Sequence, residues 1–502
     1  MSAPVDYQTR RSLVGRNMIV LFGSQAVTWI LALVLTIAEP RYLGPDGIGQ
    51  LRLGLAVWSV ANVVADLGLH TLLTLEFARS PGRANALLGP AIRLRAAAEL
   101  MSIGVVVVFM AVAGYDLETS VTITIVGIGL IVRMFAELAR SALYGIQWMA
   151  PTARADIIAK FVLVALVVGV LVAGAGAHAV AAVMIVPALL RCALLWRSLN
   201  IRRREEGWGD GDPVPARSVV RRGSPYLLGS AVQQVYGGID LVVISLVASL
   251  DEIGWYAAAA TLFGSLLFIP TTFTTTLFPA LAQLHVERPD AMHDLLARSV
   301  RSSFLVTTPI CIGTVAIATP ICVALLGDEF RNSGPVLAVF GVVLLFMFLT
   351  ILFGSFAFAT ERHKIFNVTM IIACLLTIPL DIVLIPWTND RYGNGAIGGA
   401  IAYVLTEAFI LTIVVWKLAP HIVDRPMVVR VLKCVLAGGA LFAVSWPLRD
   451  QFLAVPIVAG AITYLLAVIV LRIPDEEERH MLRRLVQRLR DRTRPRHVEP
   501  IS

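Results

Sequence analysis

Long apolar segments recur from one end of this chain to the other, and they limit its possible folds more than any other feature. Each is about 18–25 residues long, enough for a helix to cross a hydrocarbon core of roughly 30 Å. Hydrophobic residues make up 57% of the 502 positions and charged residues 15%, whereas a soluble domain carries about 25% charged residues. We therefore predict an all-α, polytopic membrane protein with about fourteen transmembrane helices, because a transmembrane β-barrel would show short alternating segments instead.

Lysine and arginine predict the orientation of these helices. The formal net charge is +8, but the basic residues lie between the apolar segments, where membrane topology rather than nucleic-acid binding places them. If both termini are cytoplasmic, Arg133 remains at mid-membrane and nearly all other basic residues fall on the cytoplasmic side. The outer side then receives Arg41, Arg52, Arg331, Arg391 and Arg449. This asymmetry predicts a multi-pass protein with both termini in the cytoplasm.

Two pairs of similar stretches indicate an internal repeat. RSLVGRNMIVLFGS (11–24) resembles RSVVRRGSPYLLGS (217–230), and DGIG (46–49) resembles DEIG (251–254), at an offset of about 205 residues. Because this offset covers an even number of predicted helices, the halves would run parallel, as in transporters whose substrate site lies between repeats. The expected parts are a cytoplasmic N-terminus (1–16), a six-helix lobe (17–199), a basic cytoplasmic inter-lobe loop (200–223), a second six-helix lobe (224–420), transmembrane helices 13 and 14 (429–472) and a basic, amphipathic cytoplasmic tail (473–502).

The tail begins with acidic residues and ends with basic ones, which suits a helix dipole. A helix lying on an anionic inner leaflet is one interpretation of it, and a solvated tail is the other. The apolar stripe that favours the first consists of Met481, Leu482, Leu485, Val486 and Leu489.

Charged side chains within the predicted membrane segments are the feature closest to function. Each costs about 2.5–3.5 kcal/mol at the bilayer centre on insertion scales, so such residues face the protein interior and mark substrate or ion pathways. In the stretch IVRMFAELAR, Arg133, Glu137 and Arg140 share one helix face at i, i+4 and i+7. Neighbouring segments contribute further charges at overlapping depths. The complete set is Arg93, Arg95, Arg133, Arg140, Asp66, Glu99 and Glu137.

Two interpretations of this set remain open. The carboxylates can pair with the arginines and fix the register of the helices, with Glu99 and Glu137 holding Arg133. Alternatively, the arginines bind a phosphate group, because a guanidinium keeps its charge and donates two parallel hydrogen bonds. The arginines outnumber the carboxylates, which favours an anionic ligand.

The second half carries fewer intramembrane charges. Asp240 and Glu407 lie near the centres of their predicted helices, where a carboxylate either carries a proton or sodium ion or bonds to neighbouring hydroxyls. Asp381 lies near an outer helix end and is expected to be structural. No cysteine or histidine spacing matches a metal site, so no metal and no cofactor is expected beyond coupling to a proton or sodium gradient. The polar wall expected opposite the cationic face consists of Gln233, Gln234 and Tyr236.

Several short stretches, in order along nearly the whole chain, carry a resemblance to a known family. They are RYLGPDGIGQL (41–51), ADLGL (65–69), EFAR (76–79), GGIDLVVISLVASLDEIGWYAAAATL (237–262), FPAL (278–281), LLGDEFRNSGPVL (325–337) and YGNGAIGGAIAYVLTE (392–407). With them the chain resembles the polysaccharide (O-antigen type) flippases of the MATE-like multidrug/oligosaccharidyl-lipid/polysaccharide exporter superfamily.

The resemblance implies two six-helix lobes that face each other across a central cavity, followed by two further helices. It implies a transporter, not an enzyme, that flips undecaprenyl-diphosphate-linked oligosaccharide across the bacterial cytoplasmic (inner) membrane for O-antigen, capsule or exopolysaccharide synthesis. The cationic interior would then face the diphosphate. Expected partners are the lipid-linked oligosaccharide, membrane lipids and other polysaccharide-assembly proteins, with no nucleic acid, and the chain is expected to be a monomer.

Three alternatives stay open. A multidrug exporter of the same superfamily would favour an anionic cavity for cationic drugs. A lipid II exporter would share the fold and a cationic cavity. A membrane-embedded polysaccharide polymerase would place catalytic residues in a large outer loop, and the predicted outer loops are short and lack paired carboxylates.

Overall fold

The computed structural model describes residues 7–209 and 214–474, and every regular element within them is a helix. The side chains of residues 7–22 and of several other helical residues, including Gln233, are outside the description. The helices of the first half are α1 (Tyr7–Asp66), α2 (Leu69–Arg79), α3 (Pro81–Ala113), α4 (Leu117–Gly145), α5 (Met149–Val172), α6 (Ala177–Val183) and α7 (Ile185–Glu205). Those of the second half are α8 (Ala216–Tyr236), α9 (Ile239–Val247), α10 (Leu250–Leu266), α11 (Phe268–Glu287), α12 (Pro289–Leu326), α13 (Ser333–Ala359), α14 (His363–Tyr392), α15 (Ala396–Leu418), α16 (Arg425–Ser445) and α17 (Ala454–Val470), with short 3₁₀ turns at Asp328–Phe330 and Pro420–Ile422.

The all-helical, multi-pass architecture predicted from the sequence is confirmed. Eleven helices among the described residues are long and apolar enough to cross a membrane, and two shorter apolar helices lie at Gln234–Val247 and Ala454–Val470. The expected count of about fourteen is not confirmed. The segment Gly23–Val63 explains part of the difference, because it contains two expected spans that run into each other.

Those two spans meet at a kink in α1. Gly44 has φ 66° and ψ −179°, a backbone conformation that a residue with a side chain rarely adopts. Pro45 follows it and has no N–H to donate to the preceding turn. The chain therefore changes direction at Gly44 and returns as a second helix within α1.

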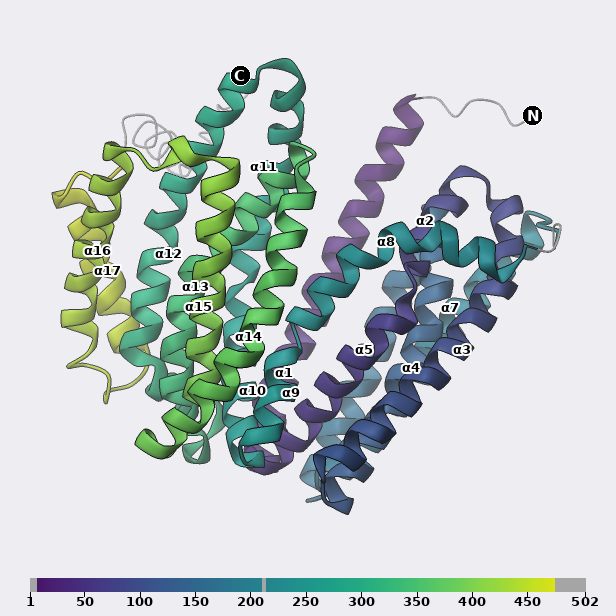
Figure 1. Ribbon diagram of the computed structural model, residues 1–502, viewed down its shortest axis with the longest axis horizontal. Coiled ribbons are helices and arrows are strands. Elements are labelled where there is room, and N and C mark those ends of the chain that lie inside the picture. Colours follow the sequence, from purple (N-terminus) through teal and green to yellow (C-terminus); the bar gives the residue numbers. More distant parts are fainter. Residues whose placement is uncertain (1–6, 210–213, 475–502) are drawn as a thin grey trace, which may run out of the picture.

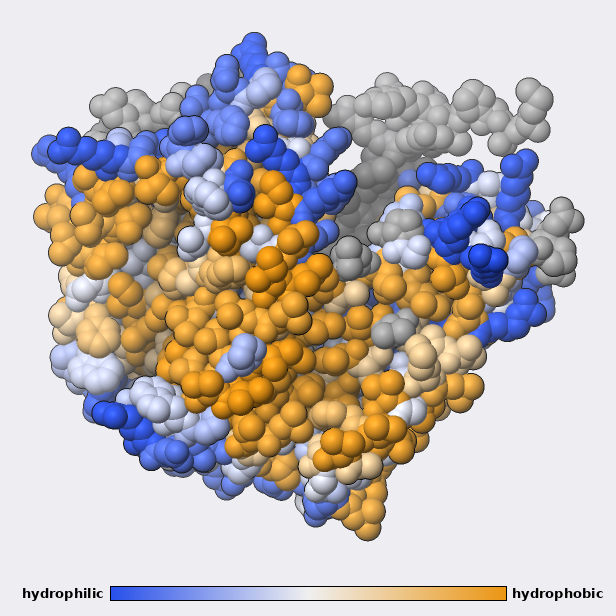
Figure 2. All heavy atoms as spheres, in the orientation of Figure 1, coloured by the Kyte–Doolittle hydropathy of each residue, from blue (hydrophilic) through white to orange (hydrophobic). Residues whose placement is uncertain are grey.

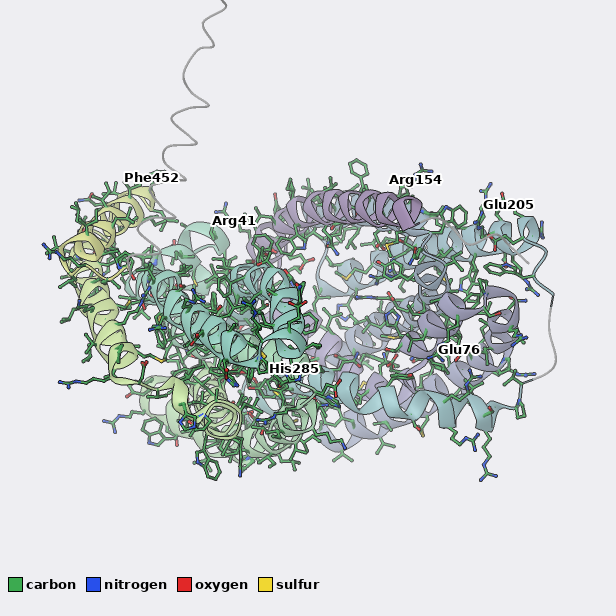
Figure 3. The ribbon with its side chains drawn as sticks, turned by 90° about the horizontal axis from the view of Figure 1, so that it is seen from above. Arg41, Glu76, Arg154, Glu205, His285 and Phe452 are labelled. Atoms are coloured by element: carbon green, nitrogen blue, oxygen red, sulfur yellow. The ribbon has the colours of Figure 1, made fainter. Side chains whose placement is uncertain are left out.

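The helices gather in two groups with a few helices between them. Figure 1 shows α2–α7 in one group and α11–α17 in the other, with α1, α9 and α10 between. Seen from above, Glu76 and Glu205 lie in the first group and His285 in the second (Figure 3). The boundaries expected for the lobes stay a prediction, and nearly all of the expected tail (473–502) lies outside the described residues.

The buried core follows the same division. One apolar cluster in the first half surrounds Phe77 and Leu143, and one in the second half surrounds Phe353. A third cluster joins the halves, with Val57 of α1 and Ile253 of α10 among its members. The face of the molecule seen in Figure 2 is apolar across its middle, and hydrophilic residues lie mainly toward its two ends. This distribution suits a protein surrounded by lipid.

The halves touch closely at the end where α1 kinks. A Cβ added to Gly49 would lie 2.2 Å from the carbonyl oxygen of Leu250, and one added to Gly254 would lie 1.9 Å from that of Pro45. We call these four residues the glycine contact. Gly49 and Gly254 end the repeated DGIG and DEIG stretches, so the contact is reciprocal between the repeats. Arg41 adds a tie at the same end, donating from Nε to Leu325 O (2.8 Å) and from Nη2 to Ala324 O (2.6 Å).

Candidate substrate cavity and buried charge clusters

A cavity of about 440 Å³ lies between the two halves. Helices α1 and α4 supply one side of it, and α8, α9, α10 and the break between α8 and α9 supply the other. No aspartate or glutamate is among the described residues that line it. The polar side chains of the lining are Arg52, Ser59, Asn62, Arg133, Gln234 and Thr261.

Arg133 is the lining residue that the sequence predicted most directly. It lies on α4, its side chain is exposed, and it forms no ion pair with any described residue. The expected pairing with Glu99 and Glu137 is not found. Glu137 instead forms ion pairs with other arginines, and its electrostatic interaction with Arg133 is weaker than those with its partners. Arg133 is therefore available to a ligand in the cavity.

One further cation that lines the cavity, Arg52, was missed from the sequence, and a second, Lys160, interacts electrostatically with the lining arginines. Arg52 was expected on the outer side, but it lines the cavity and its Nη2 lies 3.0 Å from Oε2 of Glu39. Lys160 of α5 interacts electrostatically with Glu39, Arg52 and Arg133. The place of Arg52 in the lining was missed because the kink at Gly44 brings this residue back alongside the segment of α1 that carries Glu39. Counting residues from the ends of apolar segments cannot reveal that return.

Arg95 of α3, which was also expected to bind substrate, is buried in an ion cluster. The Arg95 side chain is 1% exposed, and its Nη2 lies 3.3 Å from Asp66 Oδ1. Its Nη1 donates to Ala65 O at 2.5 Å and lies 3.8 Å from Glu99 Oε1. The prediction that Asp66, Arg95 and Glu99 lie together is correct. In the structure these residues link α3 to α1. Arg93, on the same helix, is exposed and does not line the cavity.

Glu137 organises a second ion cluster. Its carboxylate lies 3.1 Å from Arg140 Nη1 and 3.1 Å from Arg191 Nη1, and Arg191 Nε also lies 2.7 Å from Asp156 Oδ1. Arg140 does not line the cavity. Arg191 comes from α7 and Asp156 from α5, so the cluster ties three helices together. Arg191 was not singled out from the sequence, so this partner was missed.

The second half encloses a group of carboxylates and tyrosines. The Tyr256 hydroxyl donates to Asp240 Oδ2 at 2.9 Å, and the Tyr236 hydroxyl donates to Glu407 Oε1 at 2.9 Å. Tyr236 is therefore buried against Glu407 and is not part of the cavity wall, contrary to the prediction. Gln234 does line the cavity, and the side chain of Gln233 is outside the description.

Asp381 belongs to this acidic group, although the sequence placed it near an outer helix end. It is fully buried within α14, and neither carboxylate oxygen accepts a hydrogen bond from a described residue. Asp240 interacts electrostatically with both Asp381 and Glu407. Among the described residues, no three His, Cys, Asp or Glu side chains are close enough together to hold a metal ion.

Fold and cavity together define a class of protein, a multi-pass helical membrane protein whose halves enclose a cationic cavity. Residues 14–285 match the family described as "Polysaccharide biosynthesis protein". This match spans more than half of the chain, and the chain belongs to that family. No curated protein matches the sequence.

Solved structures share the fold at low sequence identity. "Lipid II flippase MurJ, inward closed conformation" has a TM-score of 0.70 and 14% identity, over 91% of this chain and 98% of that one. An inward-facing "multidrug resistance MATE family transporter of the MOP superfamily" has a TM-score of 0.64 and 11% identity, over 78% of this chain and 95% of that one. A "MOP superfamily transporter from Pyrococcus furiosus" has a TM-score of 0.50 and 13% identity, over 84% and 96%. The predicted MATE-like fold is confirmed, and the family match agrees with the predicted link to polysaccharide synthesis.

Proposed function

We propose that this protein flips an undecaprenyl-diphosphate-linked oligosaccharide across a bacterial cytoplasmic membrane, for the synthesis of a surface polysaccharide such as O-antigen, capsule or exopolysaccharide. The observation that carries the proposal is the cavity between the halves, which presents Arg52 and Arg133 without a lining carboxylate. A diphosphate needs charge-assisted hydrogen bonds wherever water is scarce, and arginine supplies them in pairs.

The sign of the cavity argues against the export of cationic drugs. Such a ligand would be repelled by Arg52, Arg133 and the nearby Lys160, and Glu39 is already paired with Arg52. A lipid II exporter is the second candidate, since lipid II carries the same diphosphate, and the fold likeness to a lipid II flippase favours it. The family match favours the polysaccharide substrate.

We further propose that the acidic group of the second half couples transport to a proton or sodium gradient. Asp381 supports this role because a buried carboxylate without a hydrogen-bond donor is stabilised by binding a proton or a cation. Asp240 and Glu407 each accept a hydrogen bond from one tyrosine hydroxyl, and they would share the negative charge of the group with Asp381.

Depletion of the protein in its own cell tests the substrate. We expect lipid-linked oligosaccharide to accumulate on the inner leaflet and surface glycan to fall, while peptidoglycan synthesis continues. An arrest of peptidoglycan synthesis would instead identify the lipid II substrate. Accumulation of unpolymerised repeat units on the outer leaflet would identify a polymerase.

Reporter fusions test the orientation. With both termini cytoplasmic, a fusion at Pro215 should read as cytoplasmic and a fusion at Asn389 as external. An external signal at Pro215 would contradict the proposed arrangement of parallel halves.

A further inference from the structure

Asn62 of α1 is a lining residue of the cationic cavity whose amide group is buried and unpaired. Its side chain is 1% exposed, and neither Oδ1 nor Nδ2 has a hydrogen-bond partner among the described residues. Burying a polar group without a hydrogen bond costs free energy, so such a group in a folded protein calls for an explanation. Because Asn62 stands in the cavity lining, a group of the ligand is one candidate partner and an ordered water is the other.

The other buried amide side chains of the described residues show that this chain can satisfy such groups. Gln50, also on α1, bonds to side chains through both its nitrogen and its oxygen. Asn85 and Asn394 each donate from Nδ2 to a backbone carbonyl oxygen, at 2.8 and 2.9 Å. Of these four buried amides, Asn62 is the one with both atoms unpaired and the one that lines the cavity.

The second segment of α1 runs beside α4 in the same direction. The hydroxyl of Thr122 donates to Oε1 of Gln50 at 3.4 Å. Further along both helices, a Cβ added to Gly127 would lie 2.1 Å from Cε2 of Trp58. The contacts therefore advance together along α1 and α4, which gives the relative depth of the residues that follow.

This register places Asn62 close to the depth of Arg133. Asn62 follows Trp58 by four residues, and Arg133 follows Gly127 by six. At a rise of 1.5 Å per residue, the two residues lie about 6 and 9 Å beyond the same contact. A ligand group held by Asn62 is therefore a near neighbour of the group held by Arg133.

The chemistry of an amide separates the possible ligand groups. An amide both donates and accepts hydrogen bonds, whereas an ionised diphosphate only accepts them and would leave Oδ1 of Asn62 unpaired. A sugar offers both functions, either through its hydroxyls or through the N–H and C=O of an acetamido group. In a lipid-linked oligosaccharide, the sugar nearest to the diphosphate is the first one, which is bonded to it directly.

We propose that the Asn62 amide binds a donor–acceptor pair on the sugar that is bonded to the diphosphate, and that it thereby selects the glycan-bearing lipid over the bare carrier. The inference rests on the proposed function and names a residue that determines specificity in the same cavity. No hydrogen bond to a described residue holds the amide in place, and the last torsion of an asparagine side chain is broad, so the amide can turn toward the sugar.

Binding to the full-length protein in nanodiscs tests this contact with three probes, which are undecaprenyl diphosphate and the same lipid carrying one glucose or one N-acetylglucosamine. Asn62→Leu removes the donor and the acceptor and keeps a branched side chain. We expect the Kd for a sugar-bearing probe to rise about tenfold while the Kd for undecaprenyl diphosphate stays unchanged, which also reports that the variant is folded. A loss that includes the glucose probe assigns the pair to hydroxyl groups, and a loss for N-acetylglucosamine alone assigns it to the acetamido group.

Thermal unfolding separates a ligand contact from a structural role. Replacing an unpaired buried amide by an apolar group of similar shape is neutral or stabilising, so Asn62→Leu should keep or raise the unfolding temperature. Gln50→Met is the matched control, because it removes a hydrogen-bonded amide of the same helix that does not line the cavity. It should lower the unfolding temperature and leave the Kd of all three probes unchanged.

The outcomes separate this inference from the proposed function. If Asn62→Leu leaves the binding of both sugar-bearing probes unchanged, water alone satisfies the amide and the inference is wrong. It is also wrong if Asn62→Leu weakens all three probes equally, or if the wild type binds the sugar-bearing probes no more tightly than undecaprenyl diphosphate. Arg133→Ala tests the proposed function independently and should weaken all three probes. If it changed no Kd while Asn62→Leu weakened only sugar-bearing probes, the sugar contact would stand and the diphosphate role of Arg133 would fail.

Discussion

The interiors of the two halves differ in the sign of their charge, although both are bundles of long apolar helices. The first half contributes Arg52, Arg133 and Lys160 to one region, and its buried carboxylates Glu39 and Glu99 are each paired with an arginine. The second half encloses Asp240, Asp381 and Glu407 with tyrosine hydroxyls as partners. The two halves share the reciprocal glycine contact, while their buried charged side chains differ. We interpret the difference as a difference in role, in which the first half binds an anion and the second half binds a cation.

The largest effect should come from a buried pair in the first half. Arg95→Met leaves the buried Glu99 without its cation, and removing one partner of a buried ion pair costs about 3–5 kcal/mol of stability. Thermal unfolding of the purified protein in detergent measures this loss. Arg133→Met is the control and should leave the unfolding temperature almost unchanged, because Arg133 has no ion pair among the described residues. Equal destabilisation by both substitutions would contradict the distinction between an arginine that stabilises the fold and an arginine that faces a ligand.

Arg133 tests the anionic side of the comparison. Arg133→Ala removes a charge-assisted contact, and a loss of about 3 kcal/mol corresponds to a roughly 100-fold fall in the transport rate. Arg133→Lys should recover only part of the rate, because an ammonium cannot donate two parallel hydrogen bonds to a phosphate. Uptake of labelled lipid-linked oligosaccharide into inverted vesicles provides the measurement. Arg93→Ala, which alters an exposed arginine outside the cavity, should stay close to the wild-type rate, and a large loss there would point to a general surface effect.

Asp381 tests the cationic side. Asp381→Asn keeps the volume of the side chain but cannot take up a proton or hold a cation. We expect the transport rate under an imposed gradient to fall about tenfold, to the rate without a gradient, which corresponds to a coupling of about 1.4 kcal/mol. The Kd for undecaprenyl diphosphate should not change. A loss of substrate binding instead would place Asp381 in the substrate site and break the division between the halves.

The smallest effect concerns the polar wall of the cavity. Gln234→Ala removes a neutral hydrogen-bonding group, so we expect the Kd for undecaprenyl diphosphate to rise roughly fivefold, for a loss of about 1 kcal/mol. Tyr236→Phe should leave this Kd unchanged, because its hydroxyl bonds to Glu407 rather than facing the cavity. The opposite pattern would restore the sequence-based assignment of Tyr236 to the wall.

The sequence predicted the fold and part of the site for different physical reasons. Apolar length and the low share of charge are enough to predict a helical membrane protein, and the cost of burying charge is enough to single out Arg133, Asp240 and Glu407. Pairings were harder to predict. Counting along a helix gives the depth of Glu137 but not its angle to neighbouring helices, so its contact with Arg191 was missed. Asp381 was misjudged because the assumed helix end was too close to it.

The glycine contact has a consequence for how the two halves can move. Backbone lies against backbone there, so the glycine contact itself can part without a side chain of these four residues rearranging, while Arg41 has to release the carbonyl oxygens of Ala324 and Leu325. A methyl group on Gly254 would collide with Pro45 O only while the halves touch, and it would cost nothing once they separate. Such a substitution therefore shifts the population toward the conformation that is open at this end. Because the contact is reciprocal, a methyl on Gly49 would shift the same equilibrium in the same direction.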